Sequence, residues 1–574
     1  MSSLSKISGN SEKNTDKKDS GKLDEIKNLL TKINWIYVIV IVFILVYILH
    51  LLLRFHFVLW DEAVYIGIGK YIYSFGQVGL WEEIRPLGLP LLFGAVWKLG
   101  SKISIDAINI IITDRIIEML FAAGTIILVY LISLKLFNKQ IAVISAFIYA
   151  VTPLFFYNSL RLMTEIPSTF FVLLAVYFFI ERRFVIAGVV SSIAFIFRYP
   201  QGLILVCCIA ALITEFLLGR TDIKTRFREL LINSAKYIGG FVPLVGILFI
   251  FNYLMYESAL FPILKASLHQ GNPAYAINDL LLNIFYYPFN LYIQNLFLIF
   301  GLIGLFILLR DMYVRVLTRI NEYKKLRNKT YTFNKPAEFS DIIELEKKSY
   351  YNESIIIVIT FIVYLAYLTF MINKQERFGL MLLPFTAILS GYGLVYVFKY
   401  INSLDLRENA REQNTKEQFW LKKLPYLLLI IYIVYAGTLS LHKDYNKFLS
   451  SPKDEPEIIK EYYKFFSDNY QGINQGIILT SDPVHVAYTD IKMIPFYFSV
   501  EEGYDIYNKW TTDPQLMPQV KAVVFIEAPF MCFDKKCEES LRPELFEKIK
   551  DSNSNKLVFE KQYEEVKRIY KVDN

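Results

Sequence analysis

The stretch WIYVIVIVFILVYILHLLL, residues Trp35–Leu53, decides the fold class, because it contains no Asp, Glu, Lys or Arg. An α-helix needs about twenty apolar residues to cross the hydrocarbon core of a bilayer, and this stretch has that length. It ends at Arg54 rather than at the small residues of a signal-peptide cleavage site. We therefore predict a first membrane span here, not a cleaved signal peptide.

The rest of the 574-residue chain repeats this pattern in separate apolar blocks. Hydrophobic residues make up 54% of the chain and charged residues 20%, whereas soluble proteins average about 45–50% and about 25%. The blocks predict an α-helical polytopic membrane protein with about eleven transmembrane helices. This excludes a soluble enzyme, a nucleic-acid-binding protein and an outer-membrane β-barrel, whose strands are shorter and alternate. The expected spans are 34–54, 114–136, 140–158, 164–181, 184–198, 201–218, 232–254, 290–310, 353–372, 378–399 and 422–441.

Basic residues predict how these spans are oriented in the cell membrane. Lys and Arg gather in the gaps after spans two, four, six, eight and ten, as they do in the N-terminal tail. By the positive-inside rule these segments are cytoplasmic, and an odd number of spans places the C-terminus outside. The expected organisation is therefore a disordered cytoplasmic tail (1–32), a transmembrane domain (33–442) with a large first outer loop (55–113), and an extracytoplasmic domain (443–574).

The last segment differs in character from the rest of the chain. Its pattern predicts an amphipathic helix at 457–470, buried strands at 476–480 and 520–526, and two strands at 556–561 and 565–572 joined by a short turn. A small α/β domain fits this order of elements.

Cysteines of two kinds are expected. Cys532 and Cys537 lie in one loop of the C-terminal domain, where an oxidising compartment favours a local disulfide over the alternative, a metal pair. Cys207 and Cys208 lie inside an expected span and are predicted to be apolar packing.

Ionisable residues are costly in lipid and therefore need an explanation. Here they gather at one end of the expected spans and in the outer loops, so we expect them to converge on one cavity. Guanidinium groups are natural bidentate partners for a phosphate, and the arginines therefore suggest an anionic, lipid-linked headgroup as ligand. The residues concerned are Asp61, Glu62, Arg85, Asp114, Arg115, Arg161, Glu165, Arg198 with its neighbour Tyr199, His269 and Arg377.

Asp61 admits two interpretations from its local sequence. It precedes 63–73, an expected interfacial helix, so it is either the N-cap of that helix, with Glu62 in the first turn, or a carboxylate base at the membrane boundary. Arg85 precedes another expected interfacial helix, 86–99, and either snorkels to lipid headgroups or binds a ligand.

The order of these motifs resembles a known family. WDEAVYIGIGKYI opens the first outer loop, RPLGLPLL follows, and DRIIEMLFAAGTIILVYLISLKLF, RLMTEIP and a late Arg followed by LLP complete the series. This series resembles the GT-C glycosyltransferases, in particular the protein mannosyltransferase and aminoarabinose transferase branch (PMT-like, glycosyltransferase family 39), over most of residues 34–400. The resemblance implies inverting transfer of a hexosyl or pentosyl group from a polyprenyl (dolichyl) phosphate donor to an extracytoplasmic protein, lipid or glycan.

The resemblance also implies roles for individual residues. Asp61 matches the family's acidic residue that activates or positions the acceptor, and Glu165 stands where many members have Asp. Arg85 stands at the basic position of a Lys-Pro-Pro-like element, in which Leu87 replaces the second proline, and Arg377 matches an Arg that contacts the donor phosphate. Glu62, Arg161, Arg198, Tyr199 and His269 complete the expected substrate site. Some family members use a divalent cation; Glu62, Glu165 and His269 are the candidate ligands, and their spacing does not decide the matter.

Two functions from other classes are alternatives. A transporter or lipid-linked sugar flippase would tend to show inverted repeats and ionisable residues near the midplane, and neither is clear here. The other alternative is a non-catalytic assembly factor.

Overall fold

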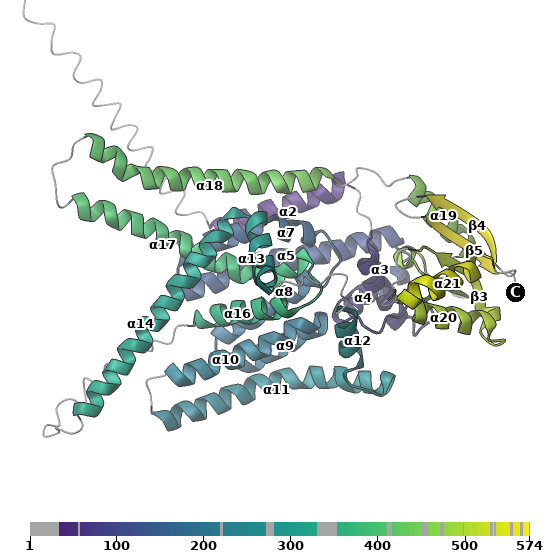
Figure 1. Cartoon of the computed structure of the whole chain (residues 1–574), viewed down its shortest axis with the longest axis horizontal. Helices are drawn as coiled ribbons and strands as arrows, with labels where there is room; N and C mark the ends of the chain where they lie inside the picture. Colours follow the sequence, from purple (N-terminus) through teal and green to yellow (C-terminus); the bar gives the residue numbers. More distant parts are fainter. Residues whose placement is uncertain are drawn as a thin grey trace, which may run out of the picture.

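The computed structural model divides into a long helical part and a smaller C-terminal domain that contains a sheet (Figure 1). The expected tail, 1–32, lies outside the residues that the structure describes. The described residues are all those other than 1–33, 55–57, 219–221, 271–279, 330–352, 410–415, 451–456, 471–475, 498, 528–531, 533–534, 552–554, 563–565 and 573–574.

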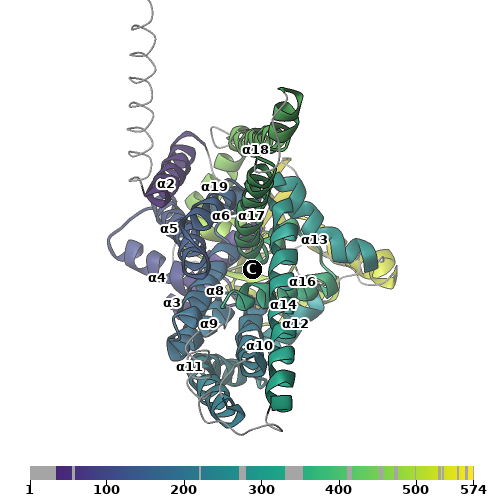
Figure 2. The ribbon, with the colours of Figure 1, turned by 90° about the vertical axis from the view of Figure 1, so that its left-hand side faces the viewer.

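The helices of the first part run mostly side by side, and the C-terminal domain lies at one end of them (Figures 1 and 2). They are α2 (Trp35–Leu53), α3 (Trp60–Tyr73), α4 (Gly88–Lys102), α5 (Ala107–Leu136), α6 (Lys139–Ala150), α7 (Pro153–Ser159), α8 (Glu165–Ile180), α9 (Phe184–Phe197), α10 (Leu203–Leu218), α11 (Ile223–Tyr256), α12 (Phe261–Gln270), α13 (Leu280–Gln294), α14 (Phe300–Lys329), α16 (Ile355–Phe370), α17 (Leu383–Asn409) and α18 (Lys416–Ser450).

The structure confirms a mostly helical chain that contains candidate membrane spans. In the described part, six helices are long and apolar enough to cross a bilayer, or seven if one bent pair is a single span. Every expected span coincides with a helix or a helix pair, but α8, α9 and α16 are shorter apolar helices. The count of eleven spans and the side on which the C-terminal domain lies therefore stay predictions.

Two expected spans are broken rather than continuous. The span predicted at 140–158 consists of α6 and α7, which are bent by 63°, because the residue before Pro153 is driven out of the helical conformation. The span predicted at 290–310 is interrupted at Asn295, which has extended backbone. The two breaks meet, since the Asn295 side-chain amide donates to the Thr152 hydroxyl at 2.9 Å and to the Ile148 carbonyl at 3.2 Å. This pairing satisfies polar groups that lipid cannot satisfy.

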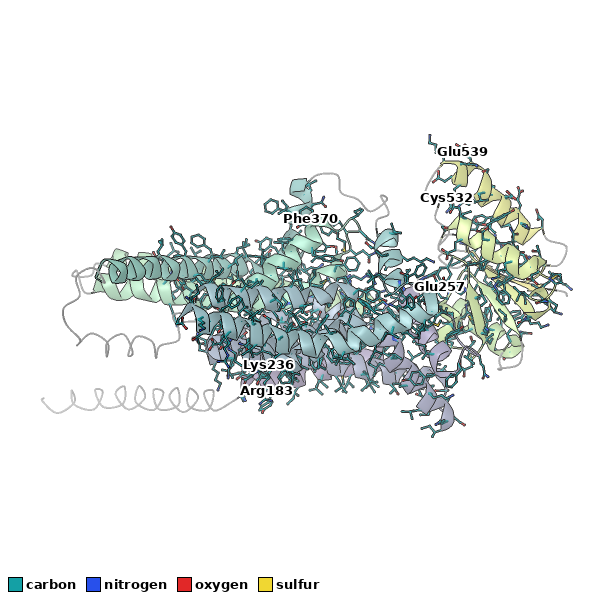
Figure 3. All side chains as sticks on the ribbon, turned by 90° about the horizontal axis from the view of Figure 1, so that it is seen from below. Arg183, Lys236, Glu257, Phe370, Cys532 and Glu539 are labelled. Atoms are coloured by element: carbon teal, nitrogen blue, oxygen red, sulfur yellow. A yellow bond between two sulfur atoms is a disulfide. The ribbon has the colours of Figure 1, made fainter. Side chains whose placement is uncertain are left out.

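The first loop forms the two helices expected there, α3 and α4. They cross with their backbones in contact, because a Cβ added to Gly69 would lie 2.5 Å from the Pro90 carbonyl oxygen and one added to Gly94 would lie 2.5 Å from that of Gly69. The pair lies between the long helices and the C-terminal domain (Figure 1). Figure 3 shows that Glu257, at the end of α11, lies beside the same domain, whereas Arg183 and Lys236 lie farther from it.

The C-terminal domain contains a five-stranded sheet in the order β2-β1-β3-β5-β4. Strands β1 (Ile477–Thr480), β3 (Val520–Phe525), β4 (Asn555–Gln562) and β5 (Val566–Val572) and helix α19 (Glu457–Tyr470) confirm the predicted elements. Strand β2 (Lys492–Pro495) and helices α20 (Val500–Thr512) and α21 (Arg542–Lys550) were not predicted. Strand β1 pairs in parallel with β2 and β3, while β3, β5 and β4 pair antiparallel.

The cysteine predictions are confirmed. Cys532 and Cys537 form a disulfide, so the alternative of a metal pair is wrong, and Cys207 and Cys208 are free and buried. The predicted domain boundary at residue 443 lies within a helix, because α18 continues to Ser450.

The C-terminal domain is joined firmly to the first loop. Backbone hydrogen bonds connect Gly79 to Ile491 (2.9 Å) and Met493 (2.8 Å), which adds residue 79 to the edge of the sheet beside β2. The buried Lys70 ammonium donates to three carbonyl groups of the domain at 3.0–3.2 Å and pairs with Asp490 at 3.0 Å. Helix α3 is thereby held by the C-terminal domain along one side.

Candidate active site

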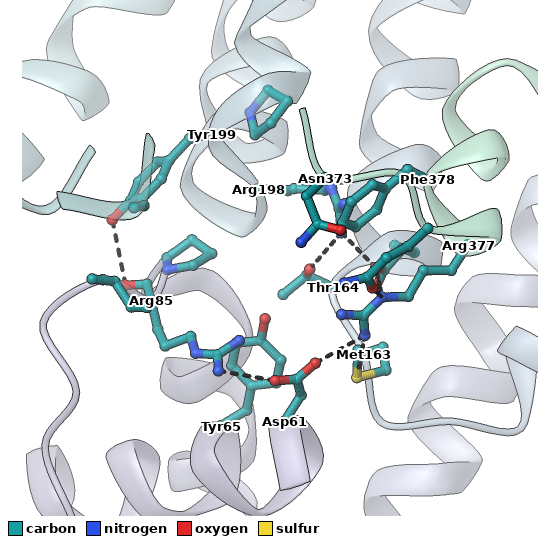
Figure 4. A pocket seen from close by; sticks show the side chains of 16 residues that line it. Asp61, Tyr65, Arg85, Met163, Thr164, Arg198, Tyr199, Asn373, Arg377 and Phe378 are labelled. Atoms are coloured by element: carbon teal, nitrogen blue, oxygen red, sulfur yellow. Dashed lines mark hydrogen bonds and ion pairs between the residues drawn. The ribbon is translucent and has the colours of Figure 1, made fainter. Parts of the chain in front are cut away.

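A cavity of about 280 Å³ lies where the first loop meets the ends of the helices. Six separate stretches of the described chain contribute to it: α3, the segment before α4, the start of α8, the turn after α9, α12 and the turn before α17. Figure 4 shows the charged side chains pointing toward one another across this space. Six of the nine predicted site residues line it, namely Asp61, Arg85, Glu165, Arg198, Tyr199 and Arg377.

Asp61 is held between two guanidinium groups. Its Oδ1 lies 2.9 Å from Nη2 of Arg85, and its Oδ2 lies 2.9 Å from Nη1 of Arg377 (Figure 4). Arg377 follows Asp61 by 316 residues in sequence, so only the tertiary fold brings this pair together. The interpretation of Asp61 as an N-cap is wrong, because α3 begins at Trp60 and Leu59 occupies the N-cap position. Asp61 lies in the first turn with its carboxylate directed into the cavity.

The ion pairs continue on both sides of Asp61 as a chain of alternating charges. Arg85 Nε also lies 3.1 Å from the buried carboxylate of Glu82. Arg377 Nε lies 3.6 Å from Glu165, whose Oε1 pairs with Arg198 at 2.7 Å. The order Glu82, Arg85, Asp61, Arg377, Glu165, Arg198 alternates acid and base, so the cations of the site are balanced by its own carboxylates.

The two arginines determine the protonation state of Asp61. Burial raises the pKa of the Asp61 carboxyl, but the charges and hydrogen bonds of Arg85 and Arg377 outweigh this effect and hold the pKa below its usual range. Burial raises the pKa of the neighbouring Glu82 carboxyl, against the opposing effect of Arg85. Asp61 therefore stays ionised more readily than Glu82, and about 20% of its side chain remains accessible from the cavity.

Aromatic rings fix the directions of the arginines. The Arg85 guanidinium lies 5.5 Å from the centroid of Tyr65, which is one helical turn after Asp61 on the same face of α3. Arg198 and Arg377 both lie over Phe378, at 4.9 and 5.6 Å. Such cation–π contacts hold a guanidinium without using all of its hydrogen-bond donors, so the arginines keep donors for an anionic ligand.

Two of the predicted residues whose side chains the structure describes, Glu62 and Arg161, do not line the cavity. Glu62 is 1% exposed and points away from Asp61, where it pairs with Arg115 (3.5 Å) and Arg161 (3.4 Å). His269 belongs to the last turn of α12, and its side chain lies outside the described part of the chain.

Of the candidate cation ligands, Glu62 and Glu165 do not face a common site in the described part of the chain. Glu62 and Glu165 each face arginines, and the described residues contain no group of three His, Cys, Asp or Glu arranged to hold a metal ion. Use of a divalent cation stays a prediction.

Sequence reasoning missed Glu82, Tyr65, Asn373 and Gln375. Tyr65 was detectable, because a residue four positions after Asp61 shares its helix face. Gln375 accepts a hydrogen bond from Nε of Arg377 at 2.7 Å, and Asn373 lines the cavity. No local pattern in the sequence predicted a role for Glu82. It pairs with Arg85 across an irregular turn.

Comparisons with known proteins agree with this architecture. A family model described as dolichyl-phosphate-mannose-protein mannosyltransferase matches residues 89–250. An uncharacterised protein of Aquifex aeolicus (strain VF5) is 26% identical over 189 residues, which are 32% of this chain and only 41% of the length of that relative.

Solved structures share the fold across almost the whole chain. ArnT from Cupriavidus metallidurans, determined with undecaprenyl phosphate bound, is 10% identical with a TM-score of 0.56 and covers 94% of this chain and 98% of its own. The oligosaccharyltransferase AglB from Archaeoglobus fulgidus, in complex with an inhibitory peptide and a dolichol-phosphate, is 14% identical with a TM-score of 0.51 and covers 88% of this chain and 70% of its own. The chain therefore has the fold of the GT-C glycosyltransferases. Together with the family match, this confirms the predicted resemblance to the protein mannosyltransferase and aminoarabinose transferase branch.

Proposed function

We propose that the chain is a membrane glycosyltransferase that transfers a sugar from a polyprenyl (dolichyl) phosphate donor to an acceptor outside the cytoplasm. The observation that carries this proposal is the carboxylate of Asp61, held at 2.9 Å by each of two arginines in a cavity at the ends of the helices. The arginines can bind the phosphate of the donor, and the carboxylate can accept the proton of the acceptor hydroxyl. The neighbours ArnT and AglB, whose structures contain undecaprenyl phosphate and dolichol-phosphate, support a donor of this class.

The reaction we infer is a single displacement with inversion. The Asp61 carboxylate accepts the proton of the acceptor hydroxyl while the acceptor oxygen attacks the anomeric carbon. The bond from that carbon to the phosphate oxygen breaks, and its electron pair leaves with the polyprenyl phosphate. Because a phosphate is already a good leaving group, the site needs cations rather than a general acid. Arg85, Arg377 and Arg198 are the residues placed to supply them.

The ion pairs suggest how donor binding activates Asp61. A carboxylate bonded to two guanidinium groups is a weak base, since the same charges that lower its pKa oppose protonation. A donor phosphate that takes hydrogen bonds from Arg85 or Arg377 relieves Asp61 of one partner and raises its basicity. The same change of hydrogen-bond partner at Arg85 or Arg377 therefore binds the phosphate and makes Asp61 a stronger base.

The position of the site supports the membrane topology proposed from the sequence. We propose about eleven spans in the cell membrane, with the tail 1–32 in the cytoplasm and the domain 443–574 outside. Helix α3, which lines the cavity, lies at the same end of the helical part as the C-terminal domain (Figure 1). The acceptor and the sugar would therefore meet on the extracytoplasmic side.

The experiment that tests this function uses the purified full-length protein. Mass spectrometry of copurifying lipids should detect a polyprenyl phosphate or a polyprenyl phosphate sugar in the parent, and much less in Arg377→Ala, which loses a phosphate ligand. With the donor identified, Asp61→Asn should transfer sugar at least about a hundredfold more slowly while still retaining the lipid. Near-parental transfer by Asp61→Asn would contradict the role of this residue, and absence of the lipid from the parent would contradict the donor class.

A further inference from the structure

A second cavity, of about 780 Å³, lies on the other side of α3. It opens where α2 ends, α4 ends and α5 begins, and it is closed by α19 and the turn before β2 of the C-terminal domain. None of its lining residues also lines the cavity around Asp61. It is large enough for a ligand of several hundred Å³, and the glycosyl-transfer chemistry described above leaves it without a function.

Part of the cavity is lined by apolar side chains. Ile105, Ile108 and Ile112, before and within the first turns of α5, line it and are 39%, 55% and 41% exposed. Helix α5 is one of the helices long and apolar enough to span a membrane, and it begins at Ala107. The exposed isoleucines therefore continue the membrane-facing surface of α5 into the cavity, and an acyl chain has a continuous apolar path between them.

The same cavity also has many basic lining residues. Arg54, Lys70, Arg115, Lys460 and Lys464 line the cavity against two acidic residues, Asp106 and Asp490.

Both carboxylates are already engaged. Asp490 pairs with Lys70 at 3.0 Å, and Asp106 accepts the backbone N–H of Asn109 at 2.9 Å as the cap of α5. Lys460 and Lys464 are exposed, one turn apart on α19, and the described residues provide no ion pair for either. Arg115 pairs with Glu62 at 3.5 Å, so the positive charge that the described residues leave without an ion pair is that of Lys460 and Lys464.

Two tyrosines also line the cavity. Tyr463, between the two lysines, stacks on Tyr488 with ring centroids 4.3 Å apart, and both line the cavity. Tyrosine is enriched where an apolar region meets water at a membrane surface. The lining of the cavity therefore contains basic, aromatic and apolar side chains, the three kinds of group that a lipid's headgroup, its glycerol region and its chains contact.

We propose that this cavity binds a membrane lipid with an anionic phosphate headgroup, its phosphate at Lys460 and Lys464 and an acyl chain along the isoleucines of α5. Charge complementarity selects an anionic over a zwitterionic lipid. The site lies between the first loop and the C-terminal domain, so the lipid also contacts both partners of the joint that holds α3. This inference does not depend on the donor site, because no described residue lines both cavities.

The test is native mass spectrometry of the full-length protein in detergent, titrated with dioleoylphosphatidylglycerol, dioleoylphosphatidylcholine or inorganic phosphate. The parent should bind phosphatidylglycerol about tenfold or more tightly than phosphatidylcholine, since each lysine near an anionic lipid contributes roughly a factor of five. Lys460→Glu/Lys464→Glu should lose this preference. The control Lys509→Glu/Lys521→Glu makes the same change of net charge at exposed positions away from the cavity and should keep it.

A second variant tests the apolar part of the lining. Ala107→Trp places an indole in the cavity without changing the charge and should weaken phosphatidylglycerol binding at least about fivefold. Equal binding of the two lipids by the parent, or a preference that survives Lys460→Glu/Lys464→Glu, would overturn the proposal. Inorganic phosphate that binds as tightly as phosphatidylglycerol would assign the cavity to a free anion instead.

Discussion

Replacing Asp61 by Asn should strengthen the binding of a polyprenyl phosphate while it abolishes most of the transfer activity. In the structure, the Asp61 carboxylate pairs with one guanidinium nitrogen of Arg85 and one of Arg377, each at 2.9 Å. A phosphate that binds these arginines must displace that carboxylate at least in part. The amide of Asn keeps the shape of the side chain but carries no charge, so the displacement costs less in the variant.

The magnitude follows from the hydrogen bonds that have to be exchanged. A hydrogen bond to a charged group contributes about 1.5–3 kcal/mol net. If the phosphate replaces one of the two bonds, removal of the competing carboxylate should tighten binding by about ten- to hundredfold. The lower end is expected here, because Asp61, Arg85 and Arg377 are each about 20% exposed and water screens part of their attraction.

The assay is isothermal titration of the detergent-solubilised protein with farnesyl phosphate, a short polyprenyl phosphate. Glu83→Gln is the matched control, because Glu83 belongs to the same loop, pairs with Lys265 at 2.9 Å and does not line the cavity. We expect about tenfold tighter binding for Asp61→Asn and no change for Glu83→Gln. Unchanged or weaker binding by Asp61→Asn would refute the idea that the phosphate and Asp61 compete for the arginines.

Three further predictions concern the rest of the chain. Lys70→Met should destabilise the joint between α3 and the C-terminal domain by about 3 kcal/mol or more, since it leaves buried carbonyl groups unpaired. The control Lys102→Met, at an exposed position, should not lower Tm. Equal Tm values for Lys70→Met and the parent would contradict the role of Lys70 in the joint. Burial raises the pKa of the Asp482 carboxyl, but the charge of Lys567 holds this pKa below its usual range. The contribution of Asp482 to stability is therefore complete at neutral pH and is lost in acid, as the pH falls through the lowered pKa. The fall of Tm in acid should be smaller in Asp482→Asn than in the parent, and an equal fall would assign the acid sensitivity to other groups. A membrane-impermeant thiol reagent should label Thr512→Cys but not a cysteine at residue 139 in intact cells, and the reverse pattern would invert the proposed topology.

Local sequence was sufficient for most of the secondary structure. The amphipathic pattern of 457–470, the apolar runs at 477–480 and 520–525 and the terminal hairpin correspond to α19, β1, β3, β4 and β5. Burial of one helix face or one strand requires a periodicity that is visible in a single short segment. The breaks were less well predicted. Pro153 was visible in the sequence, but the kink at Asn295 depends on a partner, Thr152, in another helix.

The membrane class of the protein, its helices, its disulfide and the list of residues that carry charge at the helix ends were determined by the sequence alone. These properties depend on composition and on spacing within one segment, because lipid accepts apolar blocks and makes every ionisable residue conspicuous. Which charges face one another was decided only by the tertiary structure. Asp61 and Glu62 are adjacent in sequence, yet the first faces Arg85 and Arg377 in the cavity and the second is buried against Arg115 and Arg161. Successive side chains of a helix point about 100° apart, so the packing of α3 between the long helices and the C-terminal domain determines which carboxylate becomes available for chemistry.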